Sequence, residues 1–228
     1  MSTAVTEQLT PAGRRIERDS FAIIDREAGP HEYDRDQWSI VRRMIHATAD
    51  FELNGLTRFH PGAVEAGVAA LLAARTLIAD VEMIRVGLSR PRLAHFGVHA
   101  HQLIDDPDVI ERARWENSTR AIQAMRKARE QSLSDGGIVA VGNAPTALLE
   151  VVRQIREEEL RPALLVGMPV GFVSAAESKA ALSGLDAVPW IIVEGRKGGS
   201  TLVVAALHAL LALAEARQDA EARRKTAT

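Results

Sequence analysis

The sequence predicts an α/β protein in which a parallel sheet is covered by helices on both faces. Short apolar runs, typical of strands buried on both sides, alternate along the chain with longer segments of helical periodicity. Three of these runs lead into glycine-containing turns, at 142–146, 167–171 and 195–200, and a predicted helix follows each turn. Because parallel strands end at the same edge of a sheet, where ligands bind, we expect the three turns to lie together there.

The first part of the chain is predicted to be helical. Segments 14–28 and 34–49 place their apolar residues at helical spacing, and Gly29 with the proline after it ends the first helix. A helix of small residues is expected at 63–74, and the charged segment 110–131 is predicted as one long helix.

The rest of the chain alternates between the two kinds of element. Strands are predicted at 76–79, 137–141, 163–166 and 188–193, and helices at 80–86, 145–158, 174–182 and 201–217. The segment 96–103 also alternates like a strand. We expect a flexible N-terminal lead over 1–13, one domain over 14–216, and a charged, frayed tail over 217–228.

Composition narrows the classes of function. The 228 residues carry a net charge of −2, which gives no general attraction to nucleic acid or to an anionic membrane. With no cysteine, disulfides, cysteine-ligated metals and thiol nucleophiles are excluded. The first residues lack the features of a secretory signal, and no apolar run reaches the ~20 residues that span a bilayer, so a cytoplasmic location is expected.

The turn at 195–200 has the properties of an anion site. A glycine turn that enters a helix presents backbone N–H groups at a positive helix end, and Arg196 and Lys197 add two charges. Gly198 and Gly199 are therefore candidate ligand-binding residues, although a tight turn without a ligand has the same sequence. The basic residues are Arg except for Lys127, Lys179, Lys197 and Lys225, and Arg suits carboxylates, although a GC-rich genome produces the same bias.

One helix carries a candidate proton-transfer residue. Arg43, His46 and Asp50 fall on one side of the predicted helix 34–49, and Asp50 lies four residues after His46, where it could orient the imidazole. Histidine is the side chain best suited to move a proton near neutral pH. The alternative is a solvated charged face that includes a histidine by chance.

Other motifs carry less specific signals. Arg120, in a charged helix, and the segment 89–92, in a predicted loop, could bind carboxylates, or could be ordinary exposed arginines. His95, His99 and His101 lack the spacing of a metal site, so no metal is expected. The glycine and serine motifs of dinucleotide-binding proteins, P-loop enzymes and serine hydrolases do not occur.

Several blocks of sequence together resemble the precorrin-8X methylmutase family of cobalamin biosynthesis. The blocks lie at 20–24, 43–50, 80–83, 119–120, 141–148, 167–179 and 195–200, within a resemblance that covers about residues 14 to 214. The resemblance implies a doubly wound three-layer α/β/α fold with a five-stranded parallel sheet. It also implies a homodimer with active sites at the subunit interface.

The resemblance further implies a reaction and its residues. The family catalyses a [1,5]-sigmatropic shift of one methyl group from C11 to C12 of precorrin-8X, which gives hydrogenobyrinic acid, and it needs no cofactor. The catalytic histidine of the family matches His46. Family substrate contacts match Ser20, Arg43, Ser89 and Arg120, and the glycine turn would add N–H donors for the acetate and propionate arms of the ring.

Some positions depart from the family pattern, and some alternatives stay open. Ala79 and His60 stand where relatives often have Cys and Ser, and the segment 93–103 is the least family-like. A corrinoid carrier without catalysis is the second interpretation, and an enzyme that binds a nucleotide phosphate at the 195–200 turn is the third. The sequence is equally compatible with a metal-free and a cobalt-containing substrate, and with direct hand-over of product to the next enzyme of the pathway.

Overall fold

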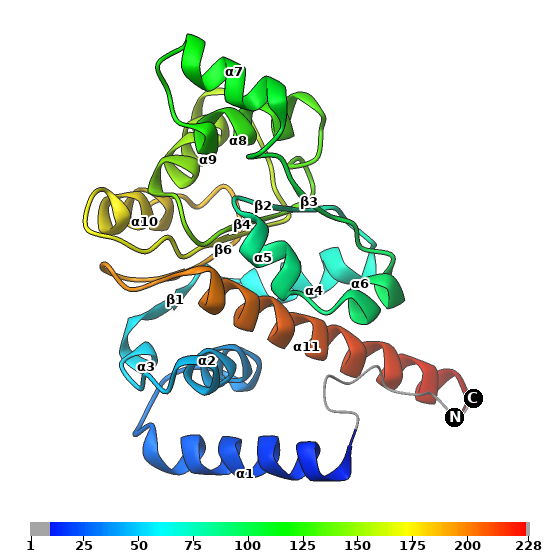
Figure 1. Ribbon diagram of the computed structural model, residues 1–228. Coiled ribbons are helices and arrows are strands. Elements are labelled where there is room, and N and C mark those ends of the chain that lie inside the picture. The colour runs from blue at the N-terminus through cyan, green and yellow to red at the C-terminus, as the bar shows by residue number, and fades with distance from the viewer. Residues whose placement is uncertain (1–9, 227–228) are drawn as a thin grey trace.

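The computed structural model of the chain describes residues 10–226, which form three layers: one central sheet with helices on each of its two faces (Figure 1). The helices are α1 (Pro11–Glu27), α2 (Arg35–Thr48), α3 (Leu53–Leu56), α4 (Ala63–Leu72), α5 (Glu82–Gly87), α6 (Arg90–Phe96), α7 (Pro107–Trp115), α8 (Arg120–Glu130), α9 (Pro145–Glu157), α10 (Ala175–Ser183) and α11 (Ser200–Thr226). The strands are β1 (Thr57–Phe59), β2 (Leu77–Ala79), β3 (Ala100–Gln102), β4 (Ile138–Val141), β5 (Leu164–Gly167) and β6 (Trp190–Val193).

The sheet has the order β1-β6-β5-β4-β2-β3. Strands β2 to β6 are parallel, which confirms the predicted five-stranded parallel sheet, and β1 adds an antiparallel edge strand beside β6. The first two parallel strands of the chain extend the sheet in one direction and the later three in the other. The order therefore reverses between β2 and β4, which is the position where doubly wound sheets usually bind a ligand.

Each face of the sheet has its own core. Successive strand residues point to opposite faces, so Val139 and Val141 of β4 pack against α8 and α9, whereas Ile138 and Ala140 pack toward α2, α4 and α11. Helix α11 is the centre of the second core and runs along α2 and α4. Helix α1 lies outside this layer and rests chiefly on α2 (Figure 1).

The structure corrects the single helix predicted over 110–131. Two helices, α7 and α8, lie here, and the chain turns between them at Asn117, which has a φ of 49°. The Thr119 side chain then caps α8 by accepting a hydrogen bond from the Ile122 N–H at 3.2 Å. The segment 89–92, predicted as a loop, is also partly helical, because α6 begins at Arg90 with Pro91 in its first turn.

The predicted frayed tail is helical through Thr226, because α11 continues past the predicted end at 217. Side chains near the end of its buried part are paired: Glu215 binds Arg92 through two hydrogen bonds, at 2.8 and 2.9 Å, and Arg217 contacts Glu65 at 2.5 Å. Helix α11 alone among the described residues is long and apolar enough to cross a membrane, but 56% of its most apolar stretch is buried inside the protein. Residues 1–9 of the predicted lead and 227–228 of the tail lie outside the described residues.

Candidate active site

The three glycine turns meet at the carboxyl edge of the parallel strands, as predicted. The Gly199 N–H donates to the Met168 carbonyl at 2.8 Å, which joins the third turn to the second. Gly142 lies so close to the start of α11 that a Cβ there would be 2.8 Å from Ser200 Cα. Glycine at 142 is therefore required by the close approach of the first turn to the third.

The first turn lies at the edge where ligand binding is expected, but it is not available to an external anion. The carboxylate of Asp80, at the end of β2, accepts hydrogen bonds from the N–H groups of Gly142, Asn143 and Ala144 at 3.0, 2.9 and 2.8 Å. Asp80 is 0% exposed, and this burial raises the pKa of its carboxyl, against the opposing effect of the three donors. The position where the strand order reverses is thus filled by the protein itself.

A cavity of about 490 Å³ lies beside the third turn. Its lining comes from the end of α2, the second turn, the third turn and the start of α11: Ala47, Thr48, Asp50, Leu53, Val170, Lys197, Gly198, Gly199, Thr201 and Leu202. A Cβ on Gly199 would meet no atom within 4 Å, so this residue faces open space. The predicted ligand-binding residues Gly198 and Gly199 therefore line a cavity that also has charged side chains in its wall.

Asp50 binds a lysine of the third turn, which corrects the expectation that it orients His46. Lys197 Nζ lies 2.6 Å from an Asp50 carboxylate oxygen and 2.9 Å from a Glu52 oxygen. The hydrogen bond from Lys197 holds the pKa of the Asp50 carboxyl below its usual value, and the two acidic partners raise the pKa of Lys197. This pairing ties the segment after α2 to the turn that lines the cavity.

Helices α1 and α2 bring three of the predicted residues together around Phe21. The His46 imidazole is exposed at the end of α2, with its centroid 5.1 Å from that of the Phe21 ring. The Arg43 guanidinium lies 5.5 Å from the same ring and binds Glu17 at 2.5 Å. Ser20, next to Phe21, donates its hydroxyl to the Ile16 carbonyl at 2.8 Å. Ala47 and Thr48, the two residues that follow His46 in α2, line the cavity, so this group adjoins it.

Two further predicted residues lie apart from His46. Ser89 precedes α6, and its N–H donates to Nε2 of His208 on α11 at 3.2 Å. Arg120, at the start of α8, is bound to Asp105 at 2.9 Å and lines a separate hollow. Neither residue contacts His46 within residues 10–226. The candidate catalytic and substrate-contact residues outside the turn therefore occupy three places in one chain: Ser20 with Arg43 and His46, then Ser89, then Arg120.

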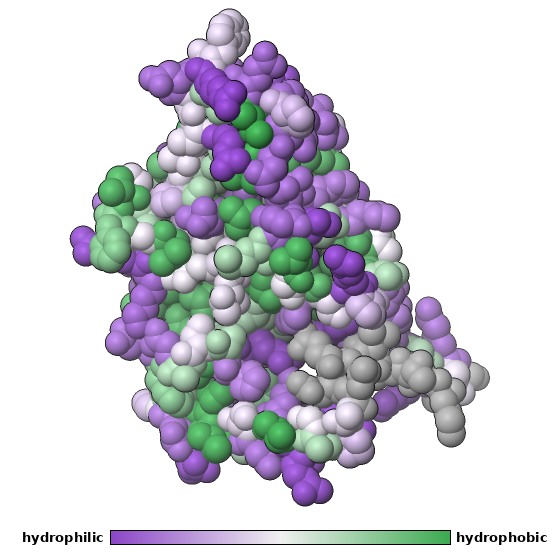
Figure 2. Space-filling view, viewed as in Figure 1, coloured by the Kyte–Doolittle hydropathy of each residue, from purple (hydrophilic) through white to green (hydrophobic). Residues whose placement is uncertain are grey.

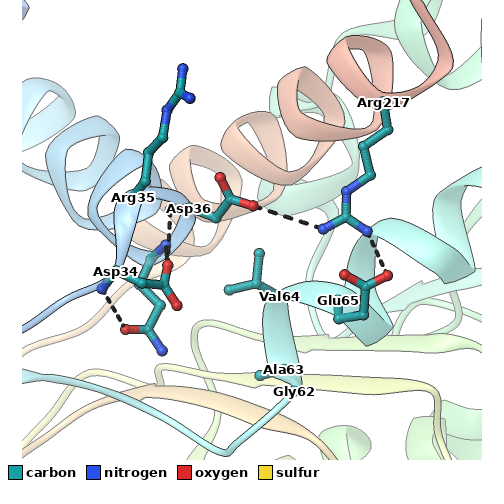
Figure 3. A pocket seen from close by; sticks show the side chains of 9 residues that line it. Asp34, Arg35, Asp36, Gly62, Ala63, Val64, Glu65 and Arg217 are labelled. Atoms are coloured by element: carbon teal, nitrogen blue, oxygen red, sulfur yellow. Dashed lines mark hydrogen bonds and ion pairs between the residues drawn. The ribbon is translucent and has the colours of Figure 1, made fainter. Parts of the chain in front are cut away.

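Another hollow, of about 360 Å³, lies at the opposite end of α2 and contains none of the predicted residues (Figure 3). Asp36 and Glu65 both point toward Arg217 there, and the guanidinium of Arg217 lies between them. These charges are already paired, so this hollow is less suited to an anionic ligand than the cavity beside Gly199.

Two residues that sequence reasoning did not select belong to the site. Asp80 was recognised only as part of a family-like block, and its three N–H partners lie some 60 residues further along the chain. Lys179 is 1% exposed, and its Nζ donates to the Lys197 carbonyl at 2.6 Å. The available signal for the second residue was a lysine in a helix made mostly of small residues.

The fold and the site define an α/β enzyme with a doubly wound sheet and a cavity beside the glycine turn that follows its last parallel strand. The chain belongs to the precorrin-8X methylmutase family, whose pattern it matches over residues 15–213.

Individual relatives agree with this assignment over nearly their whole length. Cobalt-precorrin-8 methylmutase of Leptospira interrogans is 49% identical over 217 residues, which are 93% of this chain and 99% of the relative. Precorrin-8X methylmutase of Pseudomonas aeruginosa is 39% identical over 202 residues, covering 87% and 94%. The crystal structure of precorrin-8x methyl mutase from Thermus thermophilus superposes with a TM-score of 0.82 at 54% identity, covering 88% of this chain and 98% of that one.

Proposed function

We propose that the protein is an isomerase that moves one methyl group from C11 to C12 of a precorrin-8 macrocycle, giving hydrogenobyrinic acid or its cobalt-containing equivalent. The observation that carries this proposal is the family match over residues 15–213, combined with an exposed His46 beside an arginine and a cavity lined by the Gly198–Gly199 turn. Substrate and product are isomers: the bond from the methyl carbon to C11 breaks, a bond to C12 forms, and no oxidant or reductant is consumed.

His46 acts as the proton or hydrogen-bond donor to the ring. Its imidazole is exposed, so it can reach a bound ligand, and Phe21 packs against one side of the ring and limits its orientations. A donor placed against a conjugated macrocycle draws electron density toward itself and favours the migration. Such a contribution is typically about 10²- to 10⁴-fold in rate.

The carboxylate arms of the substrate are bound by distributed polar groups. Arg43 and Arg120 supply guanidinium groups, Ser20 and Ser89 supply hydroxyls, and the Gly198 N–H supplies a backbone donor in the turn that Gly198 forms with Gly199. Arg43 and Arg120 are both paired with carboxylates of the chain, Glu17 and Asp105. A substrate carboxylate would exchange with these partners, so binding costs little desolvation of the arginines.

The names of the relatives point to both forms of the substrate. The relative at 49% identity is named for cobalt-precorrin-8, whereas the structure at 54% identity and the relative at 39% identity are named for precorrin-8X. Turnover of the metal-free and the cobalt-containing substrate by the same enzyme distinguishes the two forms.

The enzyme is proposed to be a cytoplasmic homodimer with active sites at the subunit interface. Apolar side chains remain exposed near the second turn, where Phe172 is 86% and Val173 81% exposed, and Figure 2 shows apolar surface over this region at the left. Large exposed apolar side chains favour burial against another surface. In such a dimer, Ser89 and Arg120 of one copy would lie near His46 of the other copy.

Direct hand-over of product to the next enzyme of the pathway is also part of the proposal, because the intermediates are unstable.

The test is anaerobic incubation of the purified protein with precorrin-8X or its cobalt form, followed by visible spectroscopy. We expect conversion by the wild type, and a loss of about 10²-fold or more in His46→Ala. His99→Ala is the matched control, because His99 is also exposed and lies outside the proposed site. Binding without conversion by the wild type would favour the carrier interpretation, and wild-type rates in His46→Ala would remove the role of that residue.

A further inference from the structure

Lys179 is a buried lysine without a carboxylate partner among the residues that the structure describes. It lies on α10, is 1% exposed, and its Nζ donates a hydrogen bond to the Lys197 carbonyl at 2.6 Å. Asp50 and Glu52, the carboxylates that contact that turn, are bound by the Lys197 side chain. A buried cation with a single neutral acceptor is costly to folding, so its presence at this edge of the sheet calls for a reason beyond stability.

The hydrogen bond fixes the direction of one peptide unit in the cavity wall. The carbonyl of Lys197 and the N–H of Gly198 belong to the same peptide, and no peptide bond in residues 10–226 is cis. In a trans peptide these two groups point in opposite directions. Since the carbonyl points to Lys179, the Gly198 N–H points away from α10. Lys197 and Gly198 both line the cavity of about 490 Å³.

Gly198 cannot rotate to relieve this arrangement. A Cβ at Gly198 would lie 2.3 Å from the Met168 carbonyl oxygen, so the backbone here is packed directly on the second turn. The next N–H, of Gly199, is already donated to the same Met168 carbonyl. No hydrogen bond from the Gly198 N–H occurs to any described residue, which leaves this donor for a ligand.

We propose that Lys179 is a positioning residue for substrate carboxylate binding: it holds and polarises the Lys197–Gly198 peptide so that the Gly198 N–H donates to a carboxylate arm of the corrinoid. The inference rests on the proposed function for the identity of the ligand. Lys179 does not touch the ligand. A positive charge on the carbonyl side of a peptide strengthens the opposite N–H as a donor.

The charge on Lys179 makes this device sensitive to pH. Burial lowers the pKa of Lys179 from its ordinary value of 10.5 to about 8. The charged groups on the elements around it are Glu177 on α10 itself, Arg156 on α9, and Arg196 and Lys197 in the third turn, whereas β6 presents apolar side chains. Arg196 lies over Phe172 and Lys197 is paired with Asp50, so neither replaces the ammonium of Lys179.

The expected result is a loss of corrinoid affinity as pH rises through about 8. The ammonium form strengthens the Gly198 donor, and the neutral amine that replaces it above that pH does so less. We expect roughly tenfold weaker binding of hydrogenobyrinic acid when the charge is lost, the size of one screened charge interaction at the protein surface. By reciprocity, bound ligand should move the titration midpoint of Lys179 upward by roughly one pH unit.

The experiment titrates full-length wild type, Lys179→Met and Lys179→Arg with hydrogenobyrinic acid between pH 6.5 and 9.5, and follows the Lys179 side chain of the wild type by carbon-13 NMR with and without ligand. Lys179→Met keeps the length of the side chain without its charge and should bind roughly tenfold more weakly at pH 7, with no alkaline loss. Lys179→Arg keeps the charge to high pH and should lose the alkaline decline.

Folding is monitored separately, because a structural role predicts a different result. Lys179→Met removes a buried charge, so its urea midpoint at pH 7 should equal or exceed that of the wild type while its affinity falls. Equal affinity in wild type and Lys179→Met, or an alkaline decline that persists in Lys179→Met, would overturn the inference. Absence of binding by the wild type at every pH would instead count against the proposed function itself.

Discussion

At the scale of single residues, Asp80 shows how one carboxylate can replace a ligand. Three consecutive N–H groups at the start of α9 form a concave donor set of the kind that binds anions, and Asp80 fills it from the neighbouring strand. Because the carboxylate is buried, its removal would leave each N–H donor without an acceptor, since water does not reach the site to replace it. Asp80 therefore joins β2 to β4 and holds the first turn against Ser200.

Replacing Asp80 should cost substantial stability. Asp80→Ala leaves buried donors without an acceptor, and we expect a loss of about 3 kcal/mol in the free energy of unfolding, measured by urea denaturation. Asp80→Asn keeps one oxygen and should lose less. Asp186→Ala is the control, since Asp186 is exposed, and its effect should stay within about 0.5 kcal/mol. Equal midpoints for Asp80→Ala and wild type would contradict this account.

Residue-level prediction succeeded where local spacing decides the arrangement. Arg43 and His46 were placed on one side of α2 from helical periodicity, and both contact the Phe21 ring. The proposed pairing of His46 with Asp50 was wrong because α2 ends at Thr48 and Ala49 adopts a φ of 54°. That left-handed residue turns Asp50 away from the helix, toward Lys197, which is 147 positions further along the chain.

At the scale of elements, the third turn is determined by contact with the second. Gly198 meets the Met168 and Pro169 carbonyls so closely that a Cβ would lie 2.3 and 2.6 Å from their oxygens. Backbone atoms cannot move aside as a flexible side chain could, so a larger residue would push the turn away from the second turn. The cavity wall would move with it.

Gly198→Ala should therefore lower both stability and ligand affinity. We expect a loss of at least about 2 kcal/mol in unfolding free energy, from overpacking against the backbone, together with weaker binding of hydrogenobyrinic acid. Gly55→Ala is the matched control, because a Cβ there meets no atom within 4 Å and its φ is not positive. Urea denaturation and a spectroscopic titration of each variant provide the two readouts, and parallel behaviour of the two variants would refute the packing argument.

Element boundaries were predictable where capping or glycine signals lie beside the apolar pattern, and less so elsewhere. The strands β4, β5 and β6 were located because each is a continuous apolar run followed by a glycine turn. The break between α7 and α8 was missed because both helices are charged and share one periodic pattern. Strand β1, with three residues, carries too little pattern to be recognised and forms by pairing with β6.

At the scale of the whole molecule, α11 joins parts that are far apart in sequence. It packs on α2 and α4, and Glu215 near its buried end binds Arg92 of α6. This pair is largely buried, with Arg92 only 3% exposed in its side chain, so loss of one partner leaves an uncompensated charge. Beyond Asp219 the helix is exposed and contributes little packing.

Two truncations should separate these contributions. A chain that ends at Ala220 keeps Glu215 and Arg217, and its thermal midpoint should stay close to that of the full chain. A chain that ends at Ala214 removes the partner of Arg92 and should lose about 3 kcal/mol or more of stability. Glu215→Gln in the full chain should reproduce a large part of that loss, and a stable chain ending at Ala214 would show that the pair contributes little.

The closure of the crevice between β2 and β4 by Asp80 also affects the size of ligand that this architecture admits. A molecule held between two strands must be thin enough to enter the gap between the helices that follow them. Here Asp80 fills that gap, and the candidate ligand-binding residues of the protein lie outside it, on the rim formed by the second and third turns. A rim places no such limit on width, so a flat macrocycle much broader than a nucleotide base can be supported at many points along its edge.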